Sequence, residues 1–366
     1  MGIVQNLYTN IDNGLKGLNK GLSTGLPKLD EITGGIQRST YYTIFGLSGT
    51  GKSGFLTYCY FYRLLKDNPN KDILIILYSL EVSAEIVYAK LLSLYLYETF
   101  GLVVPFMELL SKSCLLTDER YQYVLLGREW LESVENRFIV FDKSLNAKKL
   151  YHSLVPILQS KGILEKQGDR EVFIPNNPEQ LIVVAIDHIS IVVPSDGKTL
   201  KQEMDLISQY LLSLRNKYGI SPVVLMQQNR EASTVERRKM EMSEPELSHT
   251  KDSSNIVQDS EIVLAVYSPI KDKCVNYRGY KVLGEGGLGD VLKSVIVLKN
   301  RYGIADKVVP MAFMGSIGKF EELPKYEDIV DISYYQNINK ELNNEKDLNI
   351  KDESNKLTPN KVKFSF

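Results

Sequence analysis

The sequence predicts an α/β fold in which a mostly parallel, twisted sheet is covered by helices on both faces and ends in antiparallel strands. Three observations support this prediction. Apolar segments rich in β-branched residues alternate with amphipathic segments between residues 21 and 330, as they do when strands are buried on both faces. A glycine-rich loop joins the first of these strands to the next helix. The apolar segments from residue 262 onward lack long helices between them, which favours antiparallel pairing.

The individual elements follow from the period of the apolar residues along the chain. Strands are predicted, in order, at residues 41–45, 73–80, 137–142, 181–187, 222–227, 262–267 and 294–299. Amphipathic helices are predicted between several of them, at residues 53–67, 84–99, 118–135, 147–160 and 201–218.

The domain organisation is expected to be simple. Residues 1–20 are polar and weakly patterned, which suits an arm or a short linker helix, and residues 21–330 form one large domain. Two stretches inside it, 165–180 and 272–291, are polar or rich in glycine and are interpreted as insertions, the second as a hairpin tip. Residues 331–366 turn to Asn, Lys, Asp and Glu, and we expect a disordered tail there.

Composition limits the classes of function. The 366 residues contain 44 Lys and Arg against 45 Asp and Glu, a net charge of −1, so a nucleic-acid site must be a local patch, for example inside a ring. The three cysteines are scattered and form no metal or disulfide pattern, as in reduced intracellular proteins. Neither a signal peptide nor a membrane-spanning segment is recognisable. We therefore expect a cytoplasmic protein without a membrane partner.

The strongest motif is the glycine-rich loop GLSGTGKS at residues 46–53, which matches the pattern G-x-x-x-x-G-K-[ST]. In such a loop the backbone N–H groups turn toward the β- and γ-phosphates of a nucleotide, the lysine adds a positive charge, and the Ser hydroxyl can ligate Mg²⁺. A glycine-rich turn without function is the alternative, but a strand before the loop and a helix after it argue against it. The predicted nucleotide contacts are Gly46, Ser48, Gly49, Thr50, Gly51, Lys52, Ser53 and Gly54.

The segments around this loop resemble a known family. LSTGLPKLDEITGGIQRSTYYTIFG (22–46) resembles the RecA-like superfamily, and SLEVSAE (79–85) is similar to a motif of DnaB-type helicases. The resemblance runs in the same order over roughly residues 20–325. It implies a RecA-like P-loop NTPase core that uses ATP and Mg²⁺, and a replicative DNA helicase that moves along single-stranded DNA as a ring, with six subunits the expected number.

The same resemblance leaves a primase or a helicase loader open as a further partner. Only about twenty residues precede the predicted motor, whereas the family carries a helical domain there. This arrangement suits a minimal helicase of the kind that viral replication systems use, or a motor whose collar is a separate protein. The Asn-, Lys-, Ile- and Tyr-rich composition fits an AT-rich genome such as that of a phage, in which case the compartment is the host cytoplasm.

Two carboxylates are candidates for the chemistry of hydrolysis. Glu81 follows the predicted strand 73–80, where a carboxylate can orient the attacking water, and the resemblance places the catalytic glutamate there; favouring the start of the next helix is the alternative. Asp187 ends an apolar strand in the manner of a Walker B element and would hold Mg²⁺ through a water. His188 is expected to pack beside the site and not to bind metal.

The strand 222–227 leads into QQNR (227–230), which resembles the family's glutamine-x-asparagine-arginine segment. By that resemblance Gln227 senses the γ-phosphate, with Gln228 as the rival, and Met226 stands where the family commonly has serine. Arg230 is a predicted DNA contact.

The segment beginning KDSSNIVQDSEIVLAVY (251–267) resembles the family's channel-lining element. It implies that Lys251, Asp252 and Ser254 contact the DNA backbone, although Ser254 replaces a glycine. The basic residues 237–239 could add attraction to DNA, but a solvated charged loop is the commoner explanation.

SVIVLKNRYG (294–303) resembles the family's lysine-x-arginine-x-glycine element. The resemblance implies that Lys299 and Arg301 reach into the ATP site of the neighbouring subunit, Arg301 as an arginine finger. Two exposed basic residues at a hairpin mouth are the alternative.

Two other functions compete with the helicase. A RecA- or RadA-like recombinase would form filaments, and a regulatory ATPase related to the KaiC group would hydrolyse ATP without stimulation by DNA.

Overall fold

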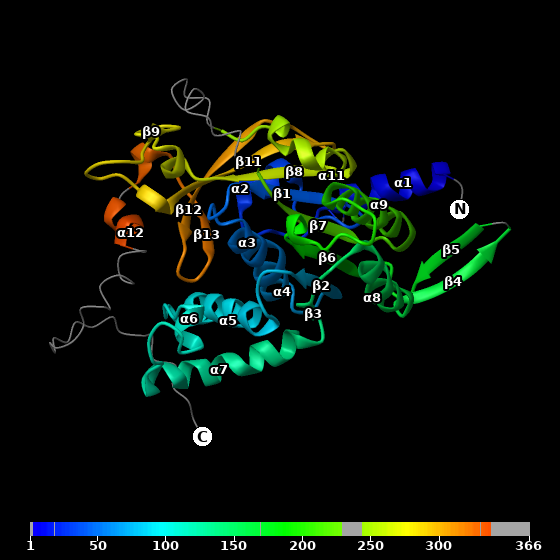
Figure 1. Cartoon of the computed structure of the whole chain (residues 1–366), viewed down its shortest axis with the longest axis horizontal. Helices are drawn as coiled ribbons and strands as arrows, with labels where there is room; N and C mark the ends of the chain where they lie inside the picture. The colour runs from blue at the N-terminus through cyan, green and yellow to red at the C-terminus, as the bar shows by residue number, and fades with distance from the viewer. Residues whose placement is uncertain (1–2, 18, 169, 229–243, 330, 338–366) are drawn as a thin grey trace.

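A nine-stranded sheet forms the centre of the molecule (Figure 1). The computed structural model describes residues 3–17, 19–168, 170–228, 244–329 and 331–337. The strands lie in the order β13-β12-β11-β8-β1-β7-β6-β2-β3. Their bounds are β1 Tyr42–Gly46, β2 Ile73–Ser79, β3 Phe138–Phe141, β6 Leu181–Asp187, β7 Ser221–Gln227, β8 Ile262–Tyr267, β11 Leu292–Asn300, β12 Lys307–Met314 and β13 Lys319–Glu322.

The sheet changes from parallel to antiparallel at β8. β8, β1, β7, β6, β2 and β3 pair in parallel, whereas β11, β12 and β13 pair antiparallel to their neighbours. β1 lies between β7 and β8, with Tyr42 opposite Val223 on one side and Ile262 on the other. These findings confirm the predicted fold class and the predicted antiparallel end. All seven predicted strands are present, with ends shifted by at most two residues.

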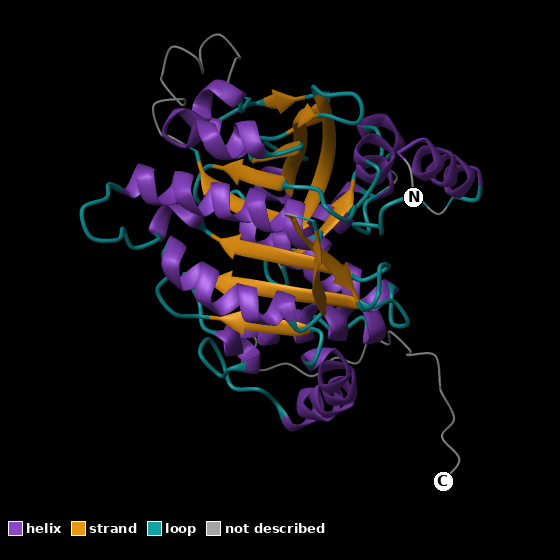
Figure 2. Ribbon diagram, turned by 90° about the vertical axis from the view of Figure 1, so that its right-hand side faces the viewer, coloured by secondary structure: helices purple, strands orange, loops and turns teal. Residues whose placement is uncertain are grey.

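Helices cover both faces of the sheet (Figure 2). One face packs on α8 (Ala147–Gln159), α9 (Leu200–Tyr218) and α11 (Ser254–Asp259), whose buried apolar residues share one core with the strands. The other face packs on α2 (Pro27–Thr33), the helix after the glycine-rich loop, α5 (Ala84–Phe100) and α7 (Asp118–Glu135). Two apolar cores therefore lie on opposite sides of the strands, which explains why the strands are apolar without alternation.

The helix that follows the glycine-rich loop is packed mainly through aromatic side chains. It runs through α3 (Lys52–Phe55), a π-helical segment η1 (Leu56–Arg63) and α4 (Leu64–Asp67). Phe55 and Tyr60 are fully buried and meet edge to face, and Phe55 also meets Phe320 of β13. Such pairs add to the hydrophobic burial of large rings. The start of this helix, and the loop before it, is therefore held in a fixed position.

Several elements lie outside the sheet and its covering helices. The helix α1 (Ile3–Leu15) and the hairpin β4 (Gly162–Gln167)–β5 (Arg170–Pro175) project at the right of Figure 1. Most of the polar stretch 165–180, interpreted from the sequence as an insertion, lies in this regular antiparallel hairpin outside the central sheet. Within 272–291 a short hairpin, β9 (Asn276–Tyr277) and β10 (Tyr280–Lys281), is present.

The region expected to be a disordered tail begins with a helix, α12 (Ile332–Asn337). Tyr335 packs on the same core as α9, and this contact orders the short segment. The sequence does not show the contact, because the segment is followed by a long polar stretch. Residues 338–366 lie outside the described part. Among the helices that the structure describes, none has both the length and the apolar character needed to cross a bilayer.

Candidate active site

The candidate site lies at one edge of the parallel part of the sheet. β1, β7, β6 and β2 are adjacent and parallel, so their carboxyl ends meet at the same edge. These ends are Gly46, Gln227, Asp187 and Ser79, the last two being directly opposite each other. Neighbouring strands are only about 4.8 Å apart. Residues far apart in the sequence are therefore brought together, as expected at the ligand-binding edge of an open α/β sheet.

A cavity of about 210 Å³ occupies this edge. It brings together most of the residues predicted for the nucleotide site with Glu81, Asp187 and Gln227 of those predicted for the chemistry, and it adds His188. The residues that line it are Ser48, Gly49, Gly51, Lys52, Ser53, Gly54, Glu81, Asp187, His188 and Gln227. Gly46 and Thr50 do not line it. Gly46 ends β1, and the Thr50 hydroxyl donates to the Leu47 carbonyl over 2.9 Å within the loop.

Glycine is required at two positions of the loop for different reasons. Gly51 has φ +98°, a conformation that residues with a side chain rarely adopt. At Gly46 there is no room for a side chain, because a Cβ would collide with the carbonyl oxygen of Val266 at the end of β8. The loop is therefore pressed against β8 on one side and turns left-handed before α3, which leaves its N–H groups available to an anion.

Lys52 is the charged group of the loop. Its side chain is buried, and its ammonium donates to the Leu47 carbonyl over 2.8 Å. Burial lowers the pKa of Lys52 to about 8, while Asp187 and Glu81 oppose the change and Lys271 adds to it. A buried ammonium that, among the described residues, bonds only to its own loop is well suited to meet phosphate oxygens.

Ser53 and Asp187 form the second contact of the site. The Ser53 hydroxyl donates to Asp187 Oδ1 over 3.1 Å. Burial raises the pKa of Asp187, and the hydrogen bond from Ser53 opposes this. A hydroxyl and a carboxylate are oxygen donors of the kind that Mg²⁺ prefers. The pair therefore fits a magnesium ion held next to the phosphates.

Glu81 lies beside this pair, at the mouth of the cavity. His188 Nε2 lies 2.9 Å from Glu81 Oε1, and the two side chains are 10% and 47% exposed, respectively. His188 Nδ1 is buried and has no hydrogen-bond partner among the described residues, so the proton of a neutral ring belongs on Nε2. His188 thus donates to Glu81 and orients it. The histidine was expected to pack beside the site, and the structure adds that it positions the Glu81 carboxylate.

The two candidate sensor glutamines point in different directions. Gln227 is exposed at the end of β7 and lines the cavity. Gln228 is buried, with its Nε2 3.3 Å from Nδ1 of His249. Its backbone N–H donates to the carbonyl of Gly46. The geometry therefore favours Gln227 over Gln228 as the group that meets a ligand.

Lys299 and Arg301 are not brought to this cavity. The Lys299 ammonium donates to the carbonyls of Val257 and Gln258 at the end of α11, over 2.7 and 3.0 Å. Arg301 donates to Glu261 Oε1 over 3.1 Å and to the Gln258 carbonyl over 2.7 Å, and its side chain is 49% exposed. Within one subunit both residues therefore hold the end of α11.

The part of the chain that supplies Asp187 and Gln227 matches a known family. Residues 145–322 match the family model described as the DnaB-like helicase C terminal domain. This part of the chain, just under half of its residues, is therefore similar to a DnaB-like helicase C-terminal domain. The match covers β6 to β13, with Asp187, Gln227, Lys299 and Arg301, but it begins after the glycine-rich loop and Glu81. The assignment of those earlier residues rests on the geometry of the cavity.

Individual relatives agree with the DnaB-like assignment. The replicative DNA helicase DnaB of Mycoplasma pneumoniae is 24% identical over 297 residues, 79% of this chain and 54% of the relative. A probable replicative DNA helicase of Trieres chinensis is 26% identical over 251 residues, 68% of this chain and 47% of the relative. The chain thus spans about half the length of the curated relatives it matches.

The fold of the DnaB-like domain also agrees with solved structures. A structure described as an ATPase domain matches with a TM-score of 0.66 at 18% identity, covering 88% of this chain and 99% of that one. A DnaB-like replicative helicase, described with its interactions with primase, matches with a TM-score of 0.65 at 18% identity, over 88% of this chain and 68% of that one. At this identity the likeness concerns the fold.

The structure also places near the site several residues that the sequence patterns did not reveal, some of them before the part of the chain that matches the family model. Lys90 of α5 is partly buried; burial lowers its pKa, while Asp187 and Glu81 oppose the change. A second cavity, of about 190 Å³, touches the first at Gly54 and is lined by Lys90, Phe106 and Phe313. An apolar space with aromatic walls next to a phosphate site has the chemistry for a nucleotide base. No motif marks these residues, because the packing of α5, α6 (Phe106–Leu109) and β12 brings them together.

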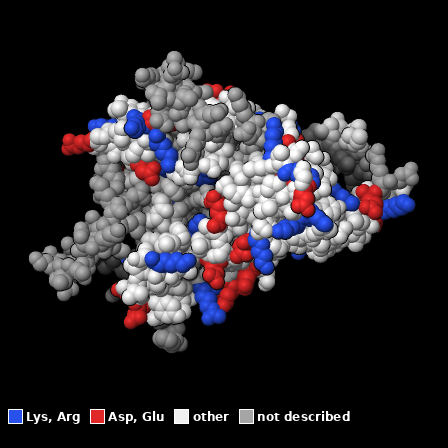
Figure 3. Space-filling model, viewed as in Figure 1, with Lys and Arg blue, Asp and Glu red and all other residues white. Residues whose placement is uncertain are grey.

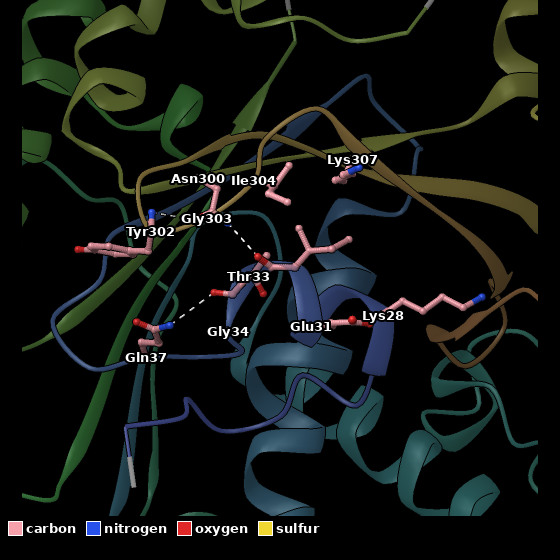
Figure 4. A pocket seen from close by; sticks show the side chains of 11 residues that line it. Lys28, Glu31, Thr33, Gly34, Gln37, Asn300, Tyr302, Gly303, Ile304 and Lys307 are labelled. Atoms are coloured by element: carbon pink, nitrogen blue, oxygen red, sulfur yellow. Dashed lines mark hydrogen bonds between the residues drawn. The ribbon is translucent and has the colours of Figure 1, made fainter. Parts of the chain in front are cut away.

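The turn that carries Arg301 is anchored to α2. Asn300 Nδ2 donates to the carbonyl of Ile32 over 2.9 Å, and both residues border a cavity of about 550 Å³ (Figure 4). This cavity is larger than the one at the loop, yet in the DnaB-like domain it lies away from Asp187 and Glu81. We assign the chemistry to the smaller cavity, because the converging charged groups are there.

The predicted DNA contacts are described only in part. Residues 251–254 lie where η4 (Leu247–Ser253) meets α11, and their side chains lie outside the described part, as do Arg230 and residues 237–239. Figure 3 shows basic and acidic side chains interspersed on the described surface of one face of the DnaB-like domain. This pattern agrees with the net charge of −1, and the described part of that face has no predominantly basic patch.

Proposed function

We propose that this chain is the ATP-hydrolysing motor of a replicative DNA helicase, which moves along single-stranded DNA as a ring. One observation carries the proposal: a single cavity collects a phosphate-binding lysine, a serine–aspartate pair, a glutamate held by a histidine, and an exposed glutamine. That set contains every group that a P-loop NTPase requires from one subunit. The match to the helicase family supports the proposal that hydrolysis drives movement along DNA.

Each group has a distinct role in the proposed reaction. Lys52 and the N–H groups of residues 46–53 bind the β- and γ-phosphates of ATP. Ser53 and Asp187 would hold Mg²⁺, which neutralises phosphate charge when bound. Glu81, oriented by His188, positions the attacking water in line with the γ-phosphate.

Gln227 is proposed to detect the γ-phosphate. The residue after it, Gln228, contacts His249 of η4, and η4 continues into α11 and the proposed DNA contacts Lys251, Asp252 and Ser254. Loss of the γ-phosphate can therefore shift the DNA-facing segment through two adjacent residues. Arg230, three positions after Gln227 in the sequence, is proposed as a further DNA contact.

The active site is proposed to be completed by a second subunit. Lys299 and Arg301 lie at the end of α11, away from their own cavity, and would reach the cavity of the next subunit in a ring. An arginine supplied in trans stabilises the charge of the transition state. We propose a homo-oligomer, with six subunits the expected number.

Further partners are also proposed. One structural relative is described with its interactions with primase, and a primase or a helicase loader is a candidate partner of this chain. Because the curated relatives are about twice as long, these interactions need not use the same surfaces here. The proposed site of action is the cytoplasm, of a bacterium or of the host if the chain is encoded by a phage.

The proposal is tested by the steady-state rate of ATP hydrolysis with and without single-stranded DNA. We expect DNA to raise the rate about tenfold, a usual size for coupling between two sites. Lys251→Ala should reduce this stimulation and leave the basal rate unchanged, while Lys198→Ala serves as the control. A rate indifferent to DNA would contradict the helicase and favour a regulatory ATPase, and filaments in place of rings would favour a recombinase.

The affinity for ATP should fall at high pH. Lys52 binds phosphate in its protonated form, and its pKa in the free protein is about 8. Above that pH the free site loses its charge, and binding must take up a proton, so the dissociation constant should rise by up to about tenfold per pH unit. The measurement is the binding of a non-hydrolysable ATP analogue from pH 7 to about 9.5.

Lys52→Arg is the matched control for this pH dependence. A guanidinium stays protonated over the whole range, so the variant should bind more weakly but with little change across the titration. A wild-type dissociation constant that is flat across the same range would contradict the lowered pKa of Lys52.

A further inference from the structure

A second lysine lies against the glycine-rich loop, and no sequence motif marks it. It is Lys271, in the short 3₁₀ helix η5 (Pro269–Asp272) that follows β8. A Cβ built on Gly49 would lie 3.0 Å from Lys271 Nζ and 3.6 Å from its Cε. The ammonium of Lys271 therefore lies directly over the middle of the loop that binds phosphate.

The surrounding structure fixes this position. β8 is the parallel neighbour of β1, and its end presses on Gly46, so the chain that leaves β8 must pass beside the loop. The Lys271 N–H donates to the carbonyl of Ser268 over 3.1 Å. The Ser268 hydroxyl in turn accepts a hydrogen bond of 2.8 Å from the fully buried Lys293.

The charges around Lys271 favour the binding of an anion at this position. Its positive charge contributes to the lowering of the pKa of both Lys52 and Lys293, so Lys271 repels each of these two ammonium groups. Lys293 has Asp290 as its acid partner. Within the described residues, the exposed Lys271 side chain has no carboxylate and no hydrogen-bond acceptor. Such a concentration of positive charge at a loop of N–H donors attracts a polyanion.

We propose that Lys271 is a second phosphate-binding lysine, which contacts the terminal phosphate of the nucleoside triphosphate beside Lys52. The inference rests on the proposed nucleotide site. The terminal phosphate is the partner because Lys52 acts at that end of the triphosphate, and the charge of Lys271 is felt at Lys52. Gly49 then has a second reason to lack a side chain, since a larger residue would displace the Lys271 ammonium.

A charge series at this position tests the proposal by the binding of fluorescent ATP and ADP analogues. Lys271→Arg should bind ATP within about threefold of the wild type, Lys271→Ala about tenfold more weakly, and Lys271→Glu more weakly still, as the loss and reversal of one charge-assisted contact predict. ADP affinity should change much less than ATP affinity in each variant.

The control is Lys281→Glu, which makes the same charge reversal in the same connection but at a lysine that lies against Gly284. It should leave ATP affinity unchanged. A Lys271 series without a graded loss, or an equal loss for ATP and ADP, would overturn the assignment of Lys271. If the wild-type chain binds neither nucleotide, the proposed function fails instead, so the two failures can be told apart.

Discussion

Glu81→Gln is expected to lower the rate of ATP hydrolysis by about 10³-fold, within the range that a positioned acid or base contributes, while ATP still binds. Glutamine has nearly the shape of glutamate, and its carbonyl oxygen can still accept the hydrogen bond that His188 Nε2 gives to Glu81. The variant therefore removes the charge that polarises water and keeps the geometry. Single-turnover hydrolysis and the binding of an ATP analogue should be measured on the same preparation.

His188→Ala is the informative companion to this variant. It leaves the carboxylate in place but removes its one hydrogen-bond partner in the cavity, so we expect a smaller loss of rate, of about tenfold, for a residue that only positions another. If Glu81→Gln hydrolyses ATP at the wild-type rate, another group positions the water and the role proposed for Glu81 is wrong.

Arg301→Ala is expected to abolish hydrolysis to a similar extent, by about 10³-fold or more, since arginine fingers contribute on this scale. The decisive measurement mixes this variant with Glu81→Gln. Each variant is inactive alone, but an interface that pairs the intact cavity of one with the intact Arg301 of the other is complete. Random mixing should restore about a quarter of the wild-type rate, because about a quarter of the interfaces in a ring then combine the two intact halves.

The structure also supplies the alternative that this experiment must exclude. Within one subunit Arg301 bonds to Glu261 and to the end of α11, so its loss could act by disturbing that helix. Glu261 keeps the N–H of Tyr41 and the guanidinium of Arg215 as partners. Arg301 is half-exposed and the buried Glu261 is not left without a partner by its loss, so Arg301→Ala should remain folded. Mixed rings that assemble but stay inactive would support the role within one subunit.

Much of the fold was predictable because its signals are local. The strands of the parallel sheet are continuous apolar segments bounded by polar residues, and burial on both faces leaves no other explanation for them. The helices were predictable because apolar residues recur along one face of each. The hairpin at 162–175 was missed because its strands are mainly polar and pair with each other instead of joining the central sheet.

The candidate site was predictable only where a motif marks it. Lys52 and Ser53 belong to a contiguous string, and Asp187 ends an apolar strand, so their convergence follows from the rule that parallel strands end at one edge. The roles of Gln227 and Arg301 came from resemblance and stay predictions. Lys90 and Lys271 could not be found from the sequence, because each is placed by an element whose packing direction the sequence does not reveal.

The place of β1 in the sheet has a consequence for folding of the chain during its synthesis. Both neighbours of β1 come late in the chain, and the hydrogen bond between Tyr41 and Glu261 joins residues that are 220 positions apart. A ribosome needs on the order of 10 to 40 s to synthesise that interval. β1 has no partner strand until residues 221–227 are made, and it lacks its second partner until residues 262–267 follow. A nucleotide bound at the proposed site could therefore stabilise the chain only after both strands have joined β1 in the sheet.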